Sequence, residues 1–406
     1  MKEWKTYKVG DICSSISETY KGHSKSVVLI NTSDVLEGRC HNHELVPNKD
    51  LKGQFKKVFK FGDILYSEIR PANKRFAYID FDATDYIAST KLMVLRNNEN
   101  VSNRFLYHFL KSESTIAELQ ALAESRSGTF PQITFSELSQ LDISIPNLET
   151  QMAITNFIDA IESKIEVNRQ INDNLEQQAE ALYKSWFIDF EPFCEEEFIE
   201  SSLGSIPTGW KVGELNDVCE IVGGGTPSKN HPEYYCERGI AWLTPKDLSV
   251  SKSKFSSRGS EDITPEGYKN SSTKLMPRGT VLFSSRAPIG YISIATNEIC
   301  TNQGFKSAVP GIAGTGYLYY FLKANTDKIE SKASGSTFKE ASGALMKSLE
   351  IIIPADGILN QFEAELTPIL NKQENIASEI QALTTLRDTL LPKLMSGELK
   401  INEIDC

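Results

Sequence analysis

The side chains that could perform catalysis in this chain do not occur in the patterns that catalytic sites require. Residues 223–226 (Gly-Gly-Gly-Thr) are rich in glycine, but no Gly-Lys-Ser/Thr follows, so a nucleotide-binding loop is not expected. The Gly-x-Ser-x-Gly elbow of hydrolases and the Asn/Asp-Pro-Pro-aromatic sequence of amino-methyl transfer are both absent. The sequence therefore predicts a chain that has no catalytic site of its own.

Cysteine and histidine residues likewise give no complete metal site. Cys40, His41 and His43 offer three donors, but a fourth ligand at suitable spacing is not evident, since Cys13 is distant. The seven cysteines are odd in number and widely spaced, which predicts free thiols in a reducing compartment. No apolar run approaches the roughly 18 residues that span a bilayer, and the N-terminus has no apolar signal region. We expect a cytoplasmic protein.

Several side chains are of the types that read the edges of DNA bases. Arginine suits guanine, whereas asparagine and glutamine suit adenine, because each pairs two hydrogen-bonding groups with two on the base. The candidates are Arg70 and Arg75 in the first half of the chain and Arg286, Asn302, Gln303 and Lys306 in the second. Asn302 and Gln303 could equally cap the turn after a strand.

Clusters of basic residues suggest contacts with phosphates. The net charge is −11, but the acidic residues gather in 147–200 and 354–406, whereas 1–146 and 201–353 are neutral to slightly basic. The phosphate candidates are Lys52, Lys56, Lys57, Lys74, Lys229, Lys246, Lys252 and Lys254. The loop candidates for backbone contacts are Thr129, Thr226, Ser336 and Thr337. Any one lysine could instead lie on a solvated face, and the glycine turn at 223–226 either approaches DNA or is purely structural.

The elements that must position these residues occur twice, because the chain repeats itself after about 210 residues. Five landmarks recur in the same order: 4–13 with 210–219, 62–67 with 279–284, 105–111 with 317–323, 127–130 with 335–338, and 141–146 with 349–354. Short β-rich runs alternate with turns and short helices within each copy. A period of this length indicates two duplicated domains of mixed α/β structure.

A long helix follows each copy. Steps of four and three residues give one seam of Ile154, Ile158, Ile161, Ile165, Asn168, Asn172, Leu175, Ala179, Leu182 and Trp186. They give a second seam of Phe362, Leu366, Ile369, Gln373, Ile376, Ile380, Leu383, Arg387, Leu390 and Leu394. Eight of ten positions are apolar in each seam, which is the 3.5-residue period of a coiled coil. Asn147 is a plausible cap for the first helix and Gly397 a plausible stop for the second.

The order domain, helix, domain, helix predicts the architecture. If the copies are equivalent, the second helix runs back along the first, so two α/β domains are separated by two long antiparallel helices that form a coiled coil. The result is a pseudo-twofold internal repeat with domain one at 1–146, helix one at 147–200, domain two at 201–353 and helix two at 354–406. Asn168 and Asn172 either fix the register inside the seam or lie in an exposed docking patch.

Two stretches of the second copy carry a family resemblance. Residues 224–229 (Gly-Gly-Thr-Pro-Ser-Lys), with 239–248 (Gly-Ile-Ala-Trp-Leu-Thr-Pro-Lys-Asp-Leu), resemble the target-recognition domain of type I restriction-modification specificity subunits. Residues 285–291, 301–306 and 390–399 are similar to later landmarks of that family. The resemblance spans the whole chain and is most specific in 210–310, whereas 1–146 lacks the Gly-Gly-Thr-Pro motif.

The resemblance implies a DNA sequence-specificity subunit without catalytic activity. Each α/β head would be a target-recognition domain that reads one half of a bipartite, asymmetric site in double-stranded DNA. The helices would set the spacing of the half-sites and dock two methyltransferase subunits, and restriction subunits would then join. S-adenosylmethionine, ATP and magnesium would belong to those partners. The alternatives are a coiled-coil scaffold that does not bind DNA and a DNA methyltransferase fused to its reader.

Overall fold

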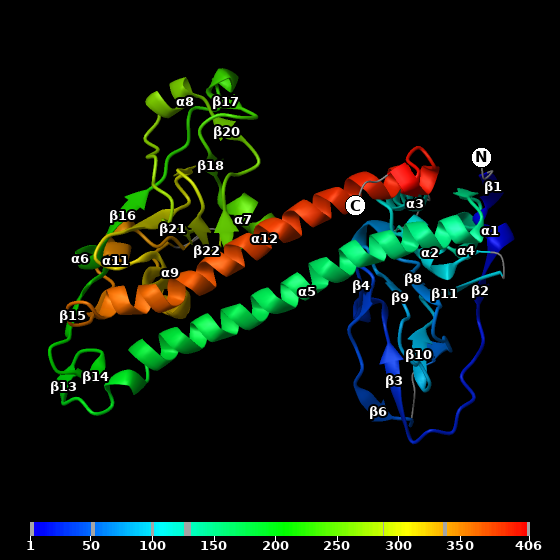
Figure 1. The fold of residues 1–406 in the computed structure, drawn as a ribbon, viewed down its shortest axis with the longest axis horizontal. Helices are drawn as coiled ribbons and strands as arrows, with labels where there is room; N and C mark the ends of the chain where they lie inside the picture. The colour runs from blue at the N-terminus through cyan, green and yellow to red at the C-terminus, as the bar shows by residue number, and fades with distance from the viewer. Residues whose placement is uncertain are drawn as a thin grey trace. The chain divides into compact units, whose positions relative to one another are not determined.

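The chain folds into two compact units, drawn in Figure 1. The computed structural model describes residues 4–49, 53–98, 101–125, 131–286, 288–335 and 339–403. Unit 1 comprises Met1–Glu166 and Ala382–Cys406, and unit 2 comprises Val167–Gln381. The boundaries between the two units therefore fall inside the two long helices, α5 (Leu148–Phe187) and α12 (Ile358–Ser396). The reason is that each end of each helix packs into the core of one unit.

Unit 1 is a mixed α/β fold that contains two four-stranded sheets, ordered β2-β11-β8-β9 and β6-β3-β10-β7. The first sheet is antiparallel, and in the second β3 and β10 are parallel. The strands of these sheets are β2 (Cys13–Ile16), β3 (Ser26–Ile30), β6 (Leu45–Pro47), β7 (Phe55–Lys57), β8 (Ile64–Ser67), β9 (Phe76–Tyr78), β10 (Tyr86–Ser89) and β11 (Leu92–Asn97). The remaining strands pair as β1 (Lys5–Lys8) with β12 (Asp142–Ile145) and β4 (Val35–Leu36) with β5 (Arg39–Cys40). The helices are α1 (Val9–Ile12), η1 (Thr32–Asp34), η2 (Pro71–Asn73), α2 (Asn103–Leu110), α3 (Glu113–Glu124), α4 (Phe135–Leu138) and η5 (Ile401–Glu403).

Unit 2 is also mixed α/β, around a five-stranded sheet of order β16-β24-β21-β22-β19. Its strands are β16 (Cys219–Gly223), β19 (Phe255–Ser256), β21 (Val281–Ser285), β22 (Ile289–Ala295) and β24 (Lys306–Pro310). The two-stranded pairs are β13 (Phe198–Ser201) with β14 (Gly204–Pro207), β15 (Lys211–Glu214) with β25 (Glu350–Ile353), β17 (Tyr235–Cys236) with β20 (Asp262–Ile263), and β18 (Trp242–Leu243) with β23 (Cys300–Thr301). The helices are η3 (Glu191–Phe193), α6 (Leu215–Val218), η4 (Pro232–Tyr234), α7 (Pro245–Ser251), α8 (Pro265–Lys269), α9 (Thr315–Ala324), α10 (Thr326–Lys332) and α11 (Gly343–Lys347).

The duplication predicted from the sequence is confirmed by the strand pairing. Lys5 faces Ile145 in unit 1, and Lys211 faces Ile353 in unit 2, so the strand that opens each copy pairs with the strand that precedes its long helix. The order β2-β11-β8-β9 returns in unit 2 as β16-β24-β21-β22. One landmark of the repeat, residues 127–130 with 335–338, lies almost wholly outside the described residues.

Local sequence signals set the ends of the long helices as expected. The Asn147 side chain accepts a hydrogen bond from the Thr150 amide at 2.9 Å, which satisfies one of the amides that a helix start leaves unpaired. Gly397 follows the last residue of α12 with φ +76°, a left-handed conformation that glycine adopts without strain. Among the described residues, no helix is both long and apolar enough to cross a membrane.

The predicted seams face inward within each unit. In unit 1, Ile154 and Ile158 of α5 share a core cluster with Leu391 and Leu394 of α12. In unit 2, Ala179 and Trp186 of α5 share a cluster with α12 residues that include Phe362 and Leu366. None of the twenty seam positions is exposed. The two helices are thus each other's apolar partners, as the 3.5-residue period predicted.

Polar pairs across the seam show that the helices are antiparallel. Asn168 donates to Glu379 at 2.9 Å, and the backbone oxygen of Asn172 accepts from Gln373 at 3.3 Å, so partner numbers fall as α5 residue numbers rise. Asn168 is only 1% exposed, which favours its role inside the seam over an exposed docking patch.

A buried charge cluster joins α2 to α5 in unit 1. His108, which is fully buried, shares a hydrogen bond of 2.8 Å with Asp159, and Arg104 donates to the other oxygen of Asp159 at 2.8 Å. Lys111 pairs with Glu162, which Arg387 of α12 approaches at 3.9 Å. A carboxylate can only accept, so His108 carries its proton on Nε2, and its buried Nδ1 lacks a hydrogen-bond partner among the described residues.

This cluster predicts an acid-sensitive unit 1. Burial, helped by the charge of Lys111, lowers the pKa of His108 from 6.5 to about 4. The unfolded chain then binds a proton near pH 6.5 and the folded chain only near pH 4, so stability is lost as pH falls through that window. At pH 5 the expected loss in the free energy of unfolding is about 2 kcal/mol.

The test is His108→Gln, which keeps a donor for Asp159 but does not titrate. Hydrogen exchange in peptides covering α2 should accelerate between pH 8 and pH 5 in the parent chain, after correction for intrinsic rates, and much less in the variant. Peptides covering α9 in unit 2 serve as the internal control. Equal acid sensitivity of α2 in both proteins would contradict the assignment.

Candidate nucleic-acid interface

A polar cleft of about 340 Å³ lies in unit 2 and contains five of the side chains that the sequence singled out. Those five are Thr226, Lys229, Lys246, Asn302 and Gln303. The cleft is also lined by Trp242, Thr244, Asp247, Ser260 and Glu261, which were not among the predicted site residues. The signal for Trp242, Thr244 and Asp247 was present, because they belong to the 239–248 stretch that carries the family resemblance.

Strand pairing brings the walls of the cleft together. β18 runs parallel to β23, with Leu243 opposite Thr301, so the residues that follow both strands emerge side by side. The Asn302 amide donates to the Leu243 carbonyl at 3.0 Å, and the Gly225 amide donates to the Thr301 carbonyl at 2.9 Å. Trp242, 5% exposed, donates from its indole nitrogen to the Gly225 carbonyl at 3.1 Å. These bonds fix three loops from distant parts of the sequence around one opening.

Packing requires glycine at position 224 of the 223–226 turn. A Cβ on Gly224 would lie 2.0 Å from the Asn302 carbonyl oxygen, whereas a Cβ on Gly223 would meet only the Lys306 side chain at 3.9 Å. Real Cβ contacts are never as short as 2.0 Å, so Gly224 has to be glycine for the two loops to touch. The turn therefore has a structural role in the fold, which was one of its two predicted roles.

The cleft offers both donors and acceptors. Asp247 caps α7 by accepting from the Thr244 amide at 2.8 Å and its hydroxyl at 2.6 Å, and its second oxygen accepts from the Ser260 amide at 3.0 Å. Burial acts to raise the pKa of Asp247, but these hydrogen bonds outweigh it and the pKa is lowered, so the carboxylate stays ionised. Lys246 and Lys229 bring positive charge to the same opening. Such a mixture suits base edges together with phosphates.

Asn302 and Gln303 are held in different ways. The Asn302 side-chain oxygen accepts a hydrogen bond from the Gly304 amide at 2.9 Å, so Asn302 caps the turn after β23, which was one of the two roles predicted for it. The Gln303 side chain is exposed, and its oxygen accepts a hydrogen bond from the Thr226 hydroxyl. That bond orients the Gln303 amide at the opening of the cleft.

Two further candidates in unit 2 share one carboxylate. Glu340 is approached by Lys306 at 3.4 Å and by Arg286 at 3.8 Å, and Arg286 forms a β-bridge with Glu340. The adjacent candidates Ser336 and Thr337 lie outside the described residues. Lys252 ends α7 in a left-handed conformation with φ +48° and is exposed.

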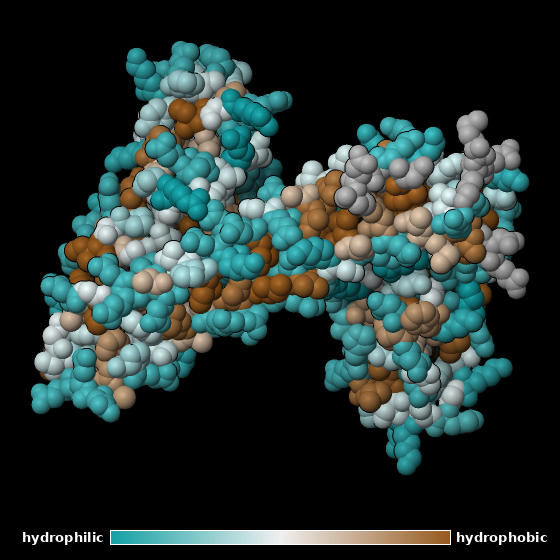
Figure 2. Space-filling view, viewed as in Figure 1, coloured by the Kyte–Doolittle hydropathy of each residue, from teal (hydrophilic) through white to brown (hydrophobic). Residues whose placement is uncertain are grey.

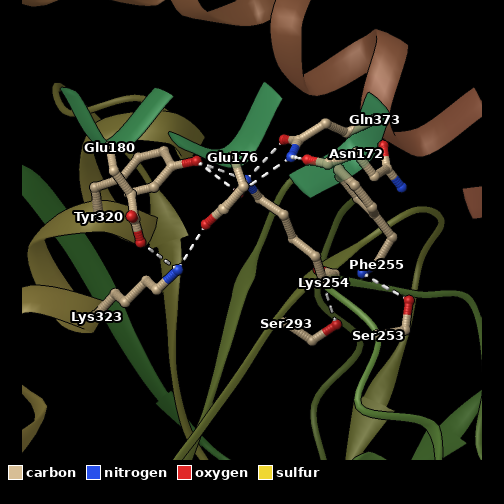
Figure 3. A network of polar contacts seen from close by, with 10 residues as sticks. All are labelled: Asn172, Glu176, Glu180, Ser253, Lys254, Phe255, Ser293, Tyr320, Lys323 and Gln373. Carbon is tan, nitrogen blue, oxygen red and sulfur yellow. Dashed lines mark hydrogen bonds and ion pairs between the residues drawn. The ribbon is translucent and has the colours of Figure 1, made fainter. Parts of the chain in front are cut away.

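Lys254, which the sequence predicted as a phosphate contact, is engaged inside unit 2. Figure 3 shows its ammonium group inside a network of polar side chains, where it donates to Glu176 at 2.5 Å, Tyr320 at 2.7 Å and Gln373 at 2.8 Å. Its side chain is 12% exposed. A lysine that gives all three hydrogens to protein acceptors has none left for a phosphate.

In unit 1 the candidate Arg70 directly follows Ile69, the residue equivalent to Arg286. Ile69 bridges to Gln132 as Arg286 bridges to Glu340, and the next residue, Arg70, donates its amide to the Pro131 carbonyl at 3.1 Å. Arg70 and Lys74 flank η2 with left-handed φ values of +44° and +52°, a conformation that costs energy in residues other than glycine. The strained turn thus presents an exposed arginine at the point where unit 2 presents Arg286.

The other candidates of unit 1 differ in whether their side chains are exposed or bonded to other groups of the protein. Lys56 is exposed on β7, but its neighbour Lys57 donates to the Thr90 carbonyl at 3.1 Å and the Leu92 carbonyl at 2.8 Å. Burial lowers the pKa of Lys57, and its ammonium group has these two internal partners. Lys74 pairs with Glu113, and Arg75 donates to the Thr32 carbonyl at 2.8 Å.

Lys52 and Thr129 lie outside the described residues. The cysteine and histidine motif is also engaged locally, since the two ring nitrogens of His43 contact the Tyr86 hydroxyl at 2.9 Å and the Cys40 carbonyl at 3.2 Å.

Comparison with known proteins places the chain in a family. Residues 1–177 and 207–392 match the family described as "Type I restriction modification DNA specificity domain". The specificity subunit of the type I restriction enzyme HindI from Haemophilus influenzae is 33% identical over 462 aligned positions, which cover 98% of this chain and all of that protein. The MjaIX specificity subunit from Methanocaldococcus jannaschii is 42% identical over 165 positions, or 40% of this chain and 38% of that protein. This chain belongs to the family of type I restriction-modification specificity subunits, and it carries the family's domain twice.

A solved structure supports the same fold. The crystal structure of a type I restriction-modification system S subunit from M. genitalium covers 97% of this chain and 96% of its own, with a TM-score of 0.61 at 15% identity. The likeness at this identity concerns the fold and not the residues of the interface.

The packing of Gly224 gives a test of the cleft. Gly224→Ala should separate the 223–226 loop from Asn302 and lower the free energy of unfolding of unit 2 by about 2 kcal/mol, the scale of overpacking in a tight site. Gly223→Ala, one residue earlier and with open space, is the matched control and should change stability by less than about 0.5 kcal/mol. Thermal denaturation measures the stability of both variants. The fluorescence of Trp242 is followed in a chain whose other tryptophans are replaced by phenylalanine. Equal tolerance of the two alanines would contradict the close approach.

Proposed function

We propose that this chain is the DNA-reading subunit of a type I restriction-modification complex and that each unit reads one half of a bipartite, asymmetric site. The observation that carries this proposal is the repeated scaffold with different polar groups at equivalent places. Unit 2 places Arg286 where unit 1 places Ile69 followed by Arg70, and the cleft around Gln303 uses a motif that 1–146 lacks. Two similar frames with unlike reading groups suit a target whose halves differ in sequence.

The long helices are the proposed docking surface for two methyltransferase subunits. Leu148, Met152, Val167 and Ile171 of α5 are between 39% and 52% exposed, although they are apolar. Figure 2 shows hydrophobic side chains along the visible side of the long helices. Apolar side chains that remain exposed on a helix suit a protein partner. In this proposal restriction subunits join the same assembly, and S-adenosylmethionine, ATP and magnesium are bound by the partners.

The division of labour between the units gives a direct test. Replacement of residues 201–353 by the corresponding segment of another specificity subunit should change one half of the methylated site and leave the other half unchanged. Methylome sequencing of a host that expresses the hybrid with its methyltransferase partner reads both halves at once. A hybrid that altered both halves would refute the modular reading.

Single substitutions in the cleft should separate base reading from phosphate contact. Gln303→Ala should cost discrimination at one base pair of the second half-site, about 1–3 kcal/mol. Lys246→Gln should weaken binding uniformly across sequences and reduce the slope of log K against log salt by about 1. Lys211→Gln, which changes an exposed lysine of β15 outside the cleft lining, is the matched control. Binding is measured by gel shift in the presence of the methyltransferase subunit, with duplexes mutated one pair at a time.

The two alternatives have their own tests. A methyltransferase fused to its reader would methylate DNA when the purified chain alone is given S-adenosylmethionine, and we expect no turnover. A scaffold without a DNA role would give no specific gel shift in the assembled complex, and we expect a specific one. Either opposite result would overturn the proposed function.

A further inference from the structure

The network around Lys254 connects the DNA-reading part of unit 2 to both long helices. The three acceptors of the Lys254 ammonium come from α5 (Glu176), α9 (Tyr320) and α12 (Gln373), as Figure 3 shows. An ammonium group has three hydrogens to donate, so these three bonds satisfy it completely. One side chain therefore holds three helices that are far apart in sequence.

The network is balanced in charge as well as in hydrogen bonds. Glu176 accepts from Lys254 with one oxygen and pairs through the other with Lys323 at 2.6 Å, and Lys323 also pairs with Glu180 at 2.7 Å. The second lysine thus offsets the second carboxylate. The oxygen of Glu176 that faces Lys254 also meets Tyr320 at 3.1 Å and Gln373 at 3.1 Å. Loss of a member of this part-buried network removes a partner from groups that are largely out of water, which opposes rearrangement of the network.

Lys254 is itself tied to the frame of the cleft. Its carbonyl accepts from the Ile294 amide at 2.8 Å and from the Ser293 hydroxyl at 3.1 Å, which fixes its backbone to β22. Only residues 252 and 253 separate it from the end of α7, whose first turn carries Lys246 into the cleft. One short path from the cleft to the helices therefore runs through Lys254, in addition to the apolar core that α5 and α12 share with β21 and β22.

We propose that Lys254 is a positioning residue that sets how strictly the complex measures the spacer between the two half-sites, an inference that rests on the proposed function. Each added base pair moves a half-site by about 3.4 Å and rotates it by about 35° around the DNA axis. A cleft fixed to α5 and α12 meets its half-site at one spacing, because both helices continue from unit 2 into unit 1. A loosely held cleft follows the displaced half-site and accepts the wrong spacing.

The experiment uses the complex assembled with methyltransferase subunits and three duplexes that carry both half-sites, with the native spacer and with one pair added or removed. The wild-type complex should bind the native spacer most tightly. Lys254→Met, which keeps the length of the side chain but not its charge, should reduce the preference for the native spacer by roughly fivefold or more. Affinity for a duplex that carries only the second half-site should stay within about twofold, because the cleft itself is unchanged.

Two companion variants guard against a purely structural effect. The double variant Lys254→Met, Glu176→Gln removes both charges, so the Glu176 carboxylate is not left facing an uncharged residue. It should relax the spacer preference to the same degree as Lys254→Met alone. Lys252→Met changes the exposed lysine at the end of α7 and should lower affinity equally on all three spacers or not at all.

The outcomes separate the inference from the proposed function. Lys254 variants that weaken binding equally on every spacer, or that keep the full preference for the native one, would overturn the positioning role. Absence of specific binding by the wild-type complex would instead overturn the proposed function.

Discussion

The packing of α5 against α12 is the constraint on which the rest of the molecule depends. Each helix carries an apolar seam of ten positions that no short domain could cover alone, and each covers the other. The same contact supplies part of the core of both units, since Ile154 and Leu394 are buried in one and Trp186 and Phe362 in the other. A helix that stabilises two cores at once cannot be shortened at either end without loss of buried apolar surface.

Different clusters of charged side chains attach the shorter helices to α5 and α12 in the two units. Unit 1 anchors α2 through His108, Arg104 and Asp159, where burial keeps the histidine neutral. Unit 2 anchors α9 and the segment after α7 through Lys254 and Glu176, and here the ammonium group stays charged and donates hydrogen bonds to protein acceptors. Lys111 and Lys323 occupy matching places in the repeat, yet the first pairs with Glu162 in the first half of α5 and the second with Glu176 in its second half. Duplicated scaffolds have thus acquired separate means of attachment.

The candidate interface follows from the repeat together with strand pairing. Parallel pairing of β18 with β23 brings the glycine turn, the start of α7 and the loop after β23 to one opening, where Gln303 and Lys246 lie beside Asp247. Five predicted residues line this opening. Residue types and motifs could suggest these residues one by one, but they could not show that the residues lie together. The lysines predicted as phosphate contacts fall into two groups. Lys56 and Lys252 are exposed, whereas Lys57 and Lys254 donate hydrogen bonds inside the protein. A run of basic residues cannot reveal this division, because adjacent strand residues face opposite sides of a sheet and a loop lysine can fold inward.

The sequence by itself determined the duplication, the two long helices with their caps and inward seams, and the family, since periodicity and ordered motifs are properties of the chain read in one dimension. Tertiary structure alone decided where the units divide, because compactness depends on which helix ends share a core. It alone decided that Gly224 must be glycine, since the carbonyl it approaches belongs to Asn302, 78 residues away. It also decided that Lys254 joins three helices, because its acceptors at 176, 320 and 373 become neighbours only when the chain is folded.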